Sequence, residues 1–493
     1  MPKLPAITPQ AQTPQLRPPA LRQTQANAKP VVVGLPTPAL ANEPAKGLKT
    51  QVTQPAKHTP ILERIGRLKQ LLEMIAPVPK AWLRTARISI SSSSNSEEPS
   101  MSMALKSCDD YAEMVKAWSR AMKWSEGLDS ALAVMLASSM STQFVGEQLW
   151  FKIIGPPSCG KTSLMEGLAT AKKWYLSKDT IRGFHSGYKH ESGKDVSLAD
   201  MVRGMTLGTK DGDTLLRAPN LKQILAEARA LYDRVSRTNY RNDVNREYMG
   251  HRMTWHLAGT SALREIDDSE LGARFLDVVV MDLISDEFES AVGMSAAYQE
   301  ARNMLILSDG KPESQYPEEV ANAMALTGGY LDFLRSNALE IAKTVTVSDR
   351  VLERCNRFGK FIAYMRARSS RDRDETPDRE FSPRLVKQLT RLAIAMAGVL
   401  NRTSVDDEVM ARVHKVVMDT SRGSTIILVK MLEGMPQGIE VRGLAVRLHM
   451  NDDKLRQQLR FLRTIGVMET DTANKRWRIT PQVSRLYSSI KVP

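Results

Sequence analysis

The spacing of apolar residues divides this chain into segments with different expected structures. Amphipathic helical spacing recurs in three stretches, at 109–122, 127–143 and 221–232. Compact apolar runs at 149–155 (LWFKIIG) and 254–261 (TWHLAGTS) predict buried strands. A glycine-rich turn follows the first run and leads into a helix that is expected from Thr162 to Trp174. Strands and helices in this order predict an α/β core.

The pattern from residue 424 to 481 is typical of a winged helix. Three helical stretches precede two short strands around a polar turn; the helices are STIILVKMLEGM, EVRGLAVRLHM and DDKLRQQLRFLRTIG, and the strands lie in VMETDTANKRWRIT. Gly466 is expected to end the third helix. The short turn with Asn451 and Asp452 before that helix has helix-turn-helix spacing.

The first hundred residues have a different character. Residues 1–60 hold 12 of the 25 prolines among Gln, Thr and Ala. Such a composition buries too little apolar surface to offset chain entropy, so the tail is predicted to be disordered. A helix is expected at 61–83 and a Ser-rich linker, SISSSSNSEEPS, at 89–100. Whether that helix packs on this chain or on a partner stays open.

Charge and cysteine content narrow the class of protein. The chain has 69 Lys and Arg against 55 Asp and Glu, a net charge of +14; residues 1–60, with seven Lys or Arg and one Glu, hold +6 of it. A positive excess favours polyanionic partners such as DNA or RNA. Three scattered cysteines fit a reducing compartment. Because the sequence has no long apolar run and no signal-peptide layout, we expect a soluble protein without a membrane partner, in the cytoplasm of a bacterial host cell.

GPPSCGKT, at 155–162, is the clearest chemical motif. It fits GxxxxGK[ST] between an apolar strand and a helix, which is the context of a phosphate-binding loop. Glycines permit the torsions that aim N–H groups at a phosphate, and the helix N-terminus adds its dipole. Lys161 would reach the β- and γ-phosphates of ATP, and Thr162 would bind Mg²⁺. The expected nucleotide-binding residues are Gly155, Pro156, Pro157, Ser158, Cys159, Gly160, Lys161, Thr162 and Ser163. The alternative is a plain turn between strand and helix.

A phosphate-binding loop also needs a carboxylate at the end of a second strand, to hold Mg²⁺ and polarise water. VRGMTLGTKDGDTLL leads to Asp211 and Asp213, whereas the more apolar FLDVVVMD ends at Asp282. Composition favours the second strand, but the order of the following elements favours the first. We therefore assign Asp211 as the Mg²⁺ ligand and Asp213 as a catalytic candidate.

The order of these elements resembles the AAA+ ATPases, and most closely the minichromosome maintenance (MCM) type of replicative helicase, over about residues 128–417. In that family a strand that ends in a polar residue, called sensor 1, follows the acid-bearing strand, and AGTS makes Thr260 or Ser261 the match. ELGARFLDVVVMD resembles the segment whose arginine finger contacts the ATP of a neighbouring subunit, which implies that role for Arg274. FSPRLVKQLTRLAIAMAGVLNRTSVDDEVMARV resembles the lid helix with its sensor 2 arginine, which implies Arg384, with Arg391 as the alternative.

The resemblance implies an α/β P-loop AAA+ core at 104–300, a helical lid at 301–423 and a winged helix at 424–493, with ATP and Mg²⁺ as cofactors. The sequence also departs from the pattern of that family. An adjacent Asp-Glu pair is usual there, but here Gly212 separates two aspartates. Either Asp213 substitutes for the glutamate, or hydrolysis is slow or absent. Residues 1–103 cannot supply the family's large N-terminal DNA-binding domain, which fits a divergent phage or mobile-element relative.

Two intervals of the core and one of the C-terminal domain are candidates for DNA contact. Residues 228–253 carry six arginines against three acids, and in the resembled family this interval holds a hairpin that projects into the pore of the ring. Residues 183–195 match a second pore loop. The expected contacts are Arg237, Arg241 and Arg246 with Tyr240, then Lys189 and Lys194, and finally Arg456 and Arg460 on the third helix of the C-terminal domain. A solvated basic loop, and a winged helix that binds protein, are the alternatives.

The leading hypothesis is an ATP-dependent DNA helicase or translocase of the MCM-like type. It would act in DNA replication on single-stranded or forked DNA, as a homohexameric ring, with the N-terminal tail recruiting other replication proteins. The rival is a replication initiator or helicase-loader switch that hydrolyses ATP slowly. A structural DNA-binding subunit with a degenerate site is disfavoured by the intact phosphate loop.

Overall fold

The computed structural model of the chain describes residues 104–491, with internal gaps at 189, 193, 243, 269–273, 281–288, 291–292, 295, 299, 301–315, 368–379, 422 and 472–474. The predicted tail at 1–60, the helix at 61–83 and the linker at 89–100 lie outside the described residues, as do Lys189 and Asp282. None of the helices in the described part is long and apolar enough to cross a membrane.

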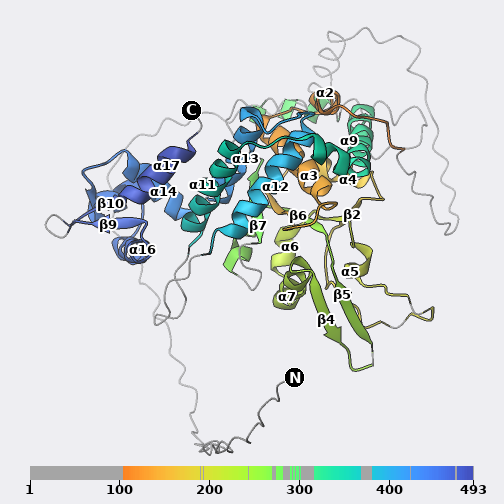
Figure 1. The fold of residues 1–493 in the computed structure, drawn as a ribbon, viewed down its shortest axis with the longest axis horizontal. Coiled ribbons are helices and arrows are strands. Elements are labelled where there is room, and N and C mark those ends of the chain that lie inside the picture. Colours follow the sequence, from red (N-terminus) through yellow and green to blue (C-terminus); the bar gives the residue numbers. More distant parts are fainter. Residues whose placement is uncertain are drawn as a thin grey trace, which may run out of the picture. The chain divides into compact units, whose positions relative to one another are not determined.

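A parallel five-stranded sheet, in the order β2-β3-β6-β1-β7, lies at the centre of the core (Figure 1). Its strands are β1 (Trp150–Ile154), β2 (Tyr175–Lys178), β3 (Thr206–Thr209), β6 (Thr254–Gly259) and β7 (Phe275–Val279). All side chains of β1, β3, β6 and β7 are buried. Strands covered on both faces are continuous apolar runs rather than alternating ones, which is why LWFKIIG marked β1 so clearly in the sequence. The α/β class is confirmed.

Helices cover both faces of this sheet. Phe151 and Ile153 of β1 belong to a cluster that includes α3 (Glu126–Ser141), whereas Trp150 belongs to a second cluster with α7 (Leu221–Tyr232). Because successive strand residues point to opposite sides, the two helices cover opposite faces. Further helices of this part are α2 (Tyr111–Ala121), α4 (Lys161–Ala169), α5 (Leu198–Met201), α6 (Gly212–Leu216) and the 3₁₀ helix η2 (Ser261–Asp268).

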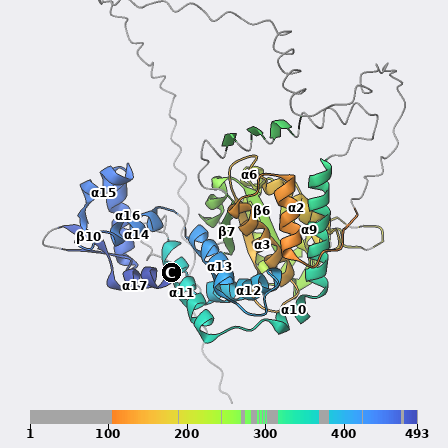
Figure 2. The same cartoon turned by 90° about the horizontal axis from the view of Figure 1, so that it is seen from above.

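A second group of described helices follows the sheet in sequence. They are α9 (Glu318–Ser336), α10 (Ala338–Thr344), α11 (Asp349–Met365), α12 (Pro383–Val399) and α13 (Asp407–Thr420). α9 packs against α2, and α12 packs against α3 and α11 (Figure 2). The predicted helical region after the core therefore contains five described helices, of which α9, α12 and α13 pack directly on the α/β part.

The helix α13 closes the outer edge of the sheet. β7 is an edge strand, and two of its backbone N–H groups donate to side chains of α13: Asp277 N–H to Thr420 Oγ1 (3.0 Å) and Val279 N–H to Asp419 Oδ2 (2.8 Å). Beneath this edge, the amine of Lys152 on β1 pairs with the Asp277 carboxylate at 3.1 Å, and both side chains are buried. The strand that leads into the phosphate loop is thus joined to β7, and β7 to α13.

The C-terminal part contains the three predicted helices and the two predicted strands, together with two elements that the sequence did not indicate. Its elements are α14 (Ser424–Glu433), β8 (Ile439–Glu440), α15 (Val441–Leu448), α16 (Asp452–Thr464), β9 (Met468–Thr470), β10 (Arg476–Ile479) and α17 (Pro481–Ile490). β8 and β9 pair antiparallel with β10, one on each side. α17 packs on α11, where Tyr487 stacks on Phe361 at 5.7 Å between ring centroids.

One predicted boundary is wrong. The helix after the phosphate loop ends at Ala169 and not at Trp174. Thr170 turns its hydroxyl back onto the carbonyl of Gly167 (2.7 Å), and the Trp174 indole donates to Asp332 on α9 (2.6 Å). The local bond of Thr170 and the tertiary bond of Trp174 accompany the turn of the chain toward β2, although the apolar pattern alone continues.

Candidate functional site

The phosphate-loop motif lies at the carboxyl end of β1, and α4 begins directly after it. Gly160 has a φ of 91° and Ser158 a φ of 61°. Only glycine adopts the first conformation without strain, and a Cβ at Gly160 would also lie 3.2 Å from Leu128. The N–H of Gly155 donates to the carbonyl of Gly259 at 3.2 Å, which ties the loop to the end of β6. The loop is therefore held between a strand end and a helix N-terminus.

The Lys161 amine lies on the loop itself. It donates to the carbonyls of Gly155 (2.8 Å) and Pro156 (2.6 Å), and the residue is buried. Thr162, the next residue on α4, is exposed. The Lys161 amine also donates to the Cys159 sulfur at 3.5 Å. An amine held by two carbonyl oxygens and a sulfur can exchange them for phosphate oxygens, which are stronger acceptors because they are charged.

The two aspartates of the acid-bearing segment have different partners. Asp211, at the end of the segment that follows β3, is exposed and caps α6 by accepting from the N–H of Thr214 at 3.0 Å. Asp213 accepts from the N–H of Thr260 at 2.9 Å and from its hydroxyl at 3.1 Å. The structure thus brings Asp213 and the sensor 1 candidate Thr260 together, while the Asp211 carboxylate keeps solvent access. Ser261 is exposed at the start of η2.

The amine of Lys210, which directly precedes Asp211, forms its ion pairs with acids other than the Asp211 carboxylate. That amine pairs with Glu166 on α4 and with Asp179 beyond β2, at 2.7 Å each. Burial opposes the charged amine, but the hydrogen bonds to Asp179 and Glu166 outweigh burial and raise the pKa of Lys210. The lysine therefore stays charged and bound to those two acids.

Arg274 lies at the end of the sheet opposite the phosphate loop. β7 runs parallel to β1 with Phe275 opposite Trp150, so Arg274 is beside the start of β1. At about 3.3 Å per residue, the start and the end of β1 are about 13 Å apart. The Arg274 side chain is 9% exposed, and its guanidinium pairs with Asp233 at 2.9 Å and lies over the Tyr232 ring at 5.4 Å.

Arg384 lies near the same end of the sheet. It donates to Glu380 at 3.1 Å, and one turn along α12 the Gln388 amide donates to the Arg274 carbonyl (3.1 Å) and to the Tyr232 hydroxyl (2.9 Å). Burial raises the pKa of the Tyr232 hydroxyl, and both arginines act on that pKa in the opposite direction. The structure therefore groups Arg274 with Arg384 and brings neither to the phosphate loop of the same chain.

Arg391, the alternative to Arg384, supports the segment before β1. Its guanidinium donates to the carbonyls of Val145 (2.9 Å) and Glu147. Burial, and then the charge of Arg234, lower the pKa of Arg391 to about 10. These contacts are those of a partly buried arginine that orders a loop.

A β-hairpin occupies the arginine-rich interval, formed by β4 (Val235–Asn239) and β5 (Asn245–Met249) (Figure 1). Arg237 is exposed and pairs with Glu247 at 2.8 Å. Arg241 is exposed between the strands. Arg246 is largely buried; it donates to loop carbonyls at residues 186 and 188 and pairs with Asp195 at 3.5 Å. The three predicted DNA contacts thus have three different surroundings.

On α16 the polar and apolar residues separate cleanly. Leu455, Leu459 and Leu462 are buried, whereas Arg456 and Arg460 are exposed. The Asn451 side chain caps the helix by accepting from the N–H of Asp453 at 2.8 Å. Both predicted DNA contacts of this helix are therefore accessible.

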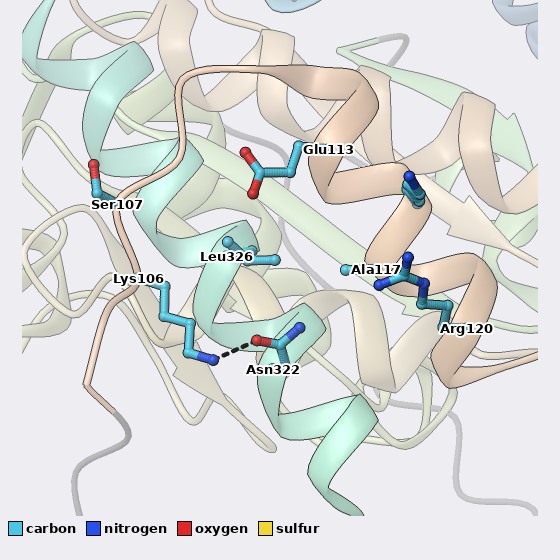
Figure 3. A pocket seen from close by; sticks show the side chains of 8 residues that line it. Lys106, Ser107, Glu113, Ala117, Arg120, Asn322 and Leu326 are labelled. Atoms are coloured by element: carbon cyan, nitrogen blue, oxygen red, sulfur yellow. Dashed lines mark hydrogen bonds between the residues drawn. The ribbon is translucent and has the colours of Figure 1, made fainter.

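A pocket between α2 and α9 lies on residues that the sequence did not single out (Figure 3). It is lined by Lys106, Ser107, Glu113, Lys116, Ala117, Arg120, Asn322 and Leu326, and Lys106 donates to Asn322. It shares no residue with the phosphate loop, the two aspartates or the arginines described above.

The sequence was compared with protein-family models and with curated proteins. No protein-family model matches the chain, and no curated protein matches its sequence.

Proposed function

We propose that this chain is an ATPase with an AAA+ core, a helical lid and a C-terminal winged helix, and that it moves along or unwinds DNA. The observation that carries the proposal is the shared edge of the sheet to which the phosphate loop, Asp211 and Thr260 belong. β6 is the neighbour of both β1 and β3. Since neighbouring strands lie about 4.8 Å apart, groups that follow these three strands are within reach of one triphosphate.

The residues at this edge have complementary roles in the proposal. Lys161 would transfer its hydrogen bonds from the loop carbonyls to the β- and γ-phosphates. Thr162 and Asp211 are exposed residues whose side-chain oxygens fit Mg²⁺, which would neutralise charge on the phosphates. Both Asp211 oxygens accept from Thr214 in the structure, so the ion would replace or share those hydrogen bonds. Thr260, backed by Asp213, would orient the γ-phosphate and the attacking water. The water oxygen bonds to the γ-phosphorus as the bond to ADP breaks.

Arg274 and Arg384 would complete the site of a second subunit. Both lie at the end of the sheet away from the phosphate loop of their own chain, yet a guanidinium is the group best matched to phosphate oxygens. A contact that joins two different edges of the same protein closes into a ring when its rotation closes. We propose a homohexamer, with ATP between subunits.

The proposed substrate is single-stranded or forked DNA, in replication in the cytoplasm of a bacterial host cell. The exposed arginines of α16, the hairpin and the charge of +14 support a polyanionic partner. The N-terminal tail is proposed to recruit other replication proteins.

Steady-state ATP hydrolysis by the purified protein, with and without single-stranded and forked DNA, tests the proposal. A motor requires turnover that DNA stimulates and that Lys161→Ala abolishes. Arg274→Ala should also abolish turnover, and mixing the two inactive variants should restore part of it, because mixed rings contain sites with both residues intact. Normal turnover in Arg274→Ala would remove the arginine from the site.

A second candidate function is an assembly switch, such as a replication initiator or helicase loader. Asp213 is already bound by the N–H and the hydroxyl of Thr260, and no glutamate is adjacent to Asp211. Tight ATP binding with almost no turnover, and ATP-dependent assembly on DNA, would favour the switch. Asp213→Asn separates the cases further, since full activity in that variant would exclude Asp213 from water activation.

A further inference from the structure

The loop from residue 183 to 197 is fastened to the β4–β5 hairpin by its backbone. Three consecutive loop carbonyls accept hydrogen bonds from two hairpin side chains. Arg246 donates to Ser186 (3.2 Å) and Tyr188 (2.9 Å), and Asn242 donates to Gly187 (2.6 Å). The forked guanidinium suits this task, because its donors are fixed relative to one another.

Buried side chains hold the two ends of the same loop. The His185 ring lies between Ser236 (2.9 Å) and Thr238 (3.0 Å) of β4 and stacks on Tyr248 of β5, with ring centroids 5.3 Å apart. The Tyr248 hydroxyl donates to Asp195 at 2.6 Å. Loop and hairpin are therefore one unit rather than two independent loops.

Gly187 allows the loop to cross the hairpin closely. A Cβ at this position would lie 2.7 Å from the Tyr240 ring, which is closer than a side chain can approach. The Tyr240 ring, which the sequence predicted to contact DNA, therefore packs against the loop at Gly187.

Tyr188 has a fixed backbone and an accessible ring. Its carbonyl is held by Arg246, yet the residue is 60% exposed, and its ring meets His190 edge-on at 6.3 Å. Arg241, also exposed, precedes the Asn242 that binds Gly187, so the two side chains start from neighbouring points. An exposed aromatic ring beside a cation is the combination that binds unpaired bases and their phosphates.

The charges around Tyr188 suit a nucleic-acid strand. Arg237 pairs with Glu247, and Arg246 with Asp195. Of the other charged side chains described in the two segments, Arg241 and Lys194 are cationic and Glu191 is anionic, and all three are exposed. The balance is positive, as is that of the whole chain.

We propose that this unit is a single-strand contact surface in which Tyr188 stacks on a base and Arg241 pairs with a neighbouring phosphate. Arg246 is a positioning residue that holds the loop, and the Tyr188 ring supplies the base contact. The inference rests on the proposed function in that it requires DNA binding.

Fluorescence anisotropy of the full-length protein on oligo(dT), and on an abasic oligomer of equal length, tests the stacking step. The abasic strand keeps every phosphate and removes every base. Tyr188→Ala should weaken oligo(dT) binding about tenfold or more, leave the abasic oligomer unaffected and leave the salt dependence unchanged, whereas Tyr188→Phe should bind as the wild type does. Phe381→Ala removes another exposed ring, 81% exposed, and should change neither affinity.

Three results would overturn the stacking step. They are equal affinity of the wild type for the two oligomers, unchanged oligo(dT) binding by Tyr188→Ala, and equal weakening on both strands. In each of these the proposed motor function can still stand. Failure of the wild type to bind either oligomer would reject the DNA function and this inference together.

The role of Arg246 is tested by the same pair of oligomers. If Arg246 positions the loop, the Arg246→Gln variant should no longer bind oligo(dT) more tightly than the abasic oligomer. The salt dependence of its affinity should stay as in the wild type. Arg241→Gln should instead weaken binding to both oligomers and reduce the slope of log affinity against log salt concentration by about one. The second pattern in Arg246→Gln would make that residue a phosphate contact and reject its positioning role.

Discussion

Arg274 forms an ion pair within its own chain and is also the residue proposed to contact ATP in a neighbouring subunit. Its guanidinium is nearly buried against Asp233, whereas the Asp233 side chain is 51% exposed. The aspartate is therefore the easier partner to displace, and a second subunit's phosphates would carry more negative charge than it does. In the proposed ring, the Asp233–Arg274 pair would be exchanged for an arginine–phosphate pair.

Removal of Asp233 tests this exchange. Asp233→Asn should allow turnover at a lower protein concentration, because Arg274 no longer has to leave an ion pair when subunits meet. The measurement is ATP hydrolysis per subunit across a dilution series, with Glu247→Gln, which releases the exposed Arg237, as the matched control. If Asp233→Asn instead loses turnover as Arg274→Ala does, the aspartate is needed to hold the arginine in place.

At the scale of elements, the buried pair between β1 and β7 is the most sensitive point of the sheet. Lys152 and Asp277 are both almost fully buried, so loss of the lysine leaves a charged carboxylate in an apolar environment. We expect Lys152→Ala to lower the free energy of unfolding by about 3–5 kcal/mol. Replacement of both residues, Lys152→Met with Asp277→Leu, should cost much less because no buried charge remains.

Urea unfolding of the two variants, followed by circular dichroism, measures this difference. A double variant as unstable as Lys152→Ala would contradict the expectation, because the loss of stability would then not come from an unpaired buried carboxylate.

The elements differ in how far sequence could predict them. α7 begins and ends as its apolar period predicts, and the phosphate loop follows its strand as the motif requires. β8 has two residues, too few for a periodic signal, and α17 follows the last predicted strand directly. The loop–hairpin unit could not be predicted, because Arg246 meets its acceptors some 60 positions away along the chain and nothing local marks the pairing.

At the scale of the whole molecule, two buried histidines, His251 and His256, and the partly buried His414 make stability depend on pH. Burial lowers the pKa of His256 to about 3 and those of His251 and His414 to about 4, against an ordinary value of 6.5. All three are neutral in the folded chain above these values, whereas the unfolded chain takes up protons as the pH falls through 6.5. Stability is therefore complete above pH 7 and is lost as the pH falls toward 4.

Each of these histidines should contribute a slope of up to about 1.4 kcal/mol per pH unit below 6.5. Urea midpoints between pH 7.5 and 5 measure the slope, at pH values where most carboxylates have not yet titrated. His256→Gln, which keeps a polar group near the Ser138 hydroxyl that now contacts the ring at 2.7 Å, should reduce the slope by the contribution of this one histidine. A midpoint that does not change over this range would contradict the expectation.

The contact between β7 and α13 has a consequence for the behaviour of the protein when heated. An exposed edge strand is a template on which a strand from another molecule can pair, which is a common first step of aggregation. Here Asp419 and Thr420 occupy the donors of Asp277 and Val279 that such a strand would need. Detachment of α13, without any unfolding of the sheet, would expose this edge, so we expect the stability of the α13 contact to set the temperature at which the protein begins to precipitate.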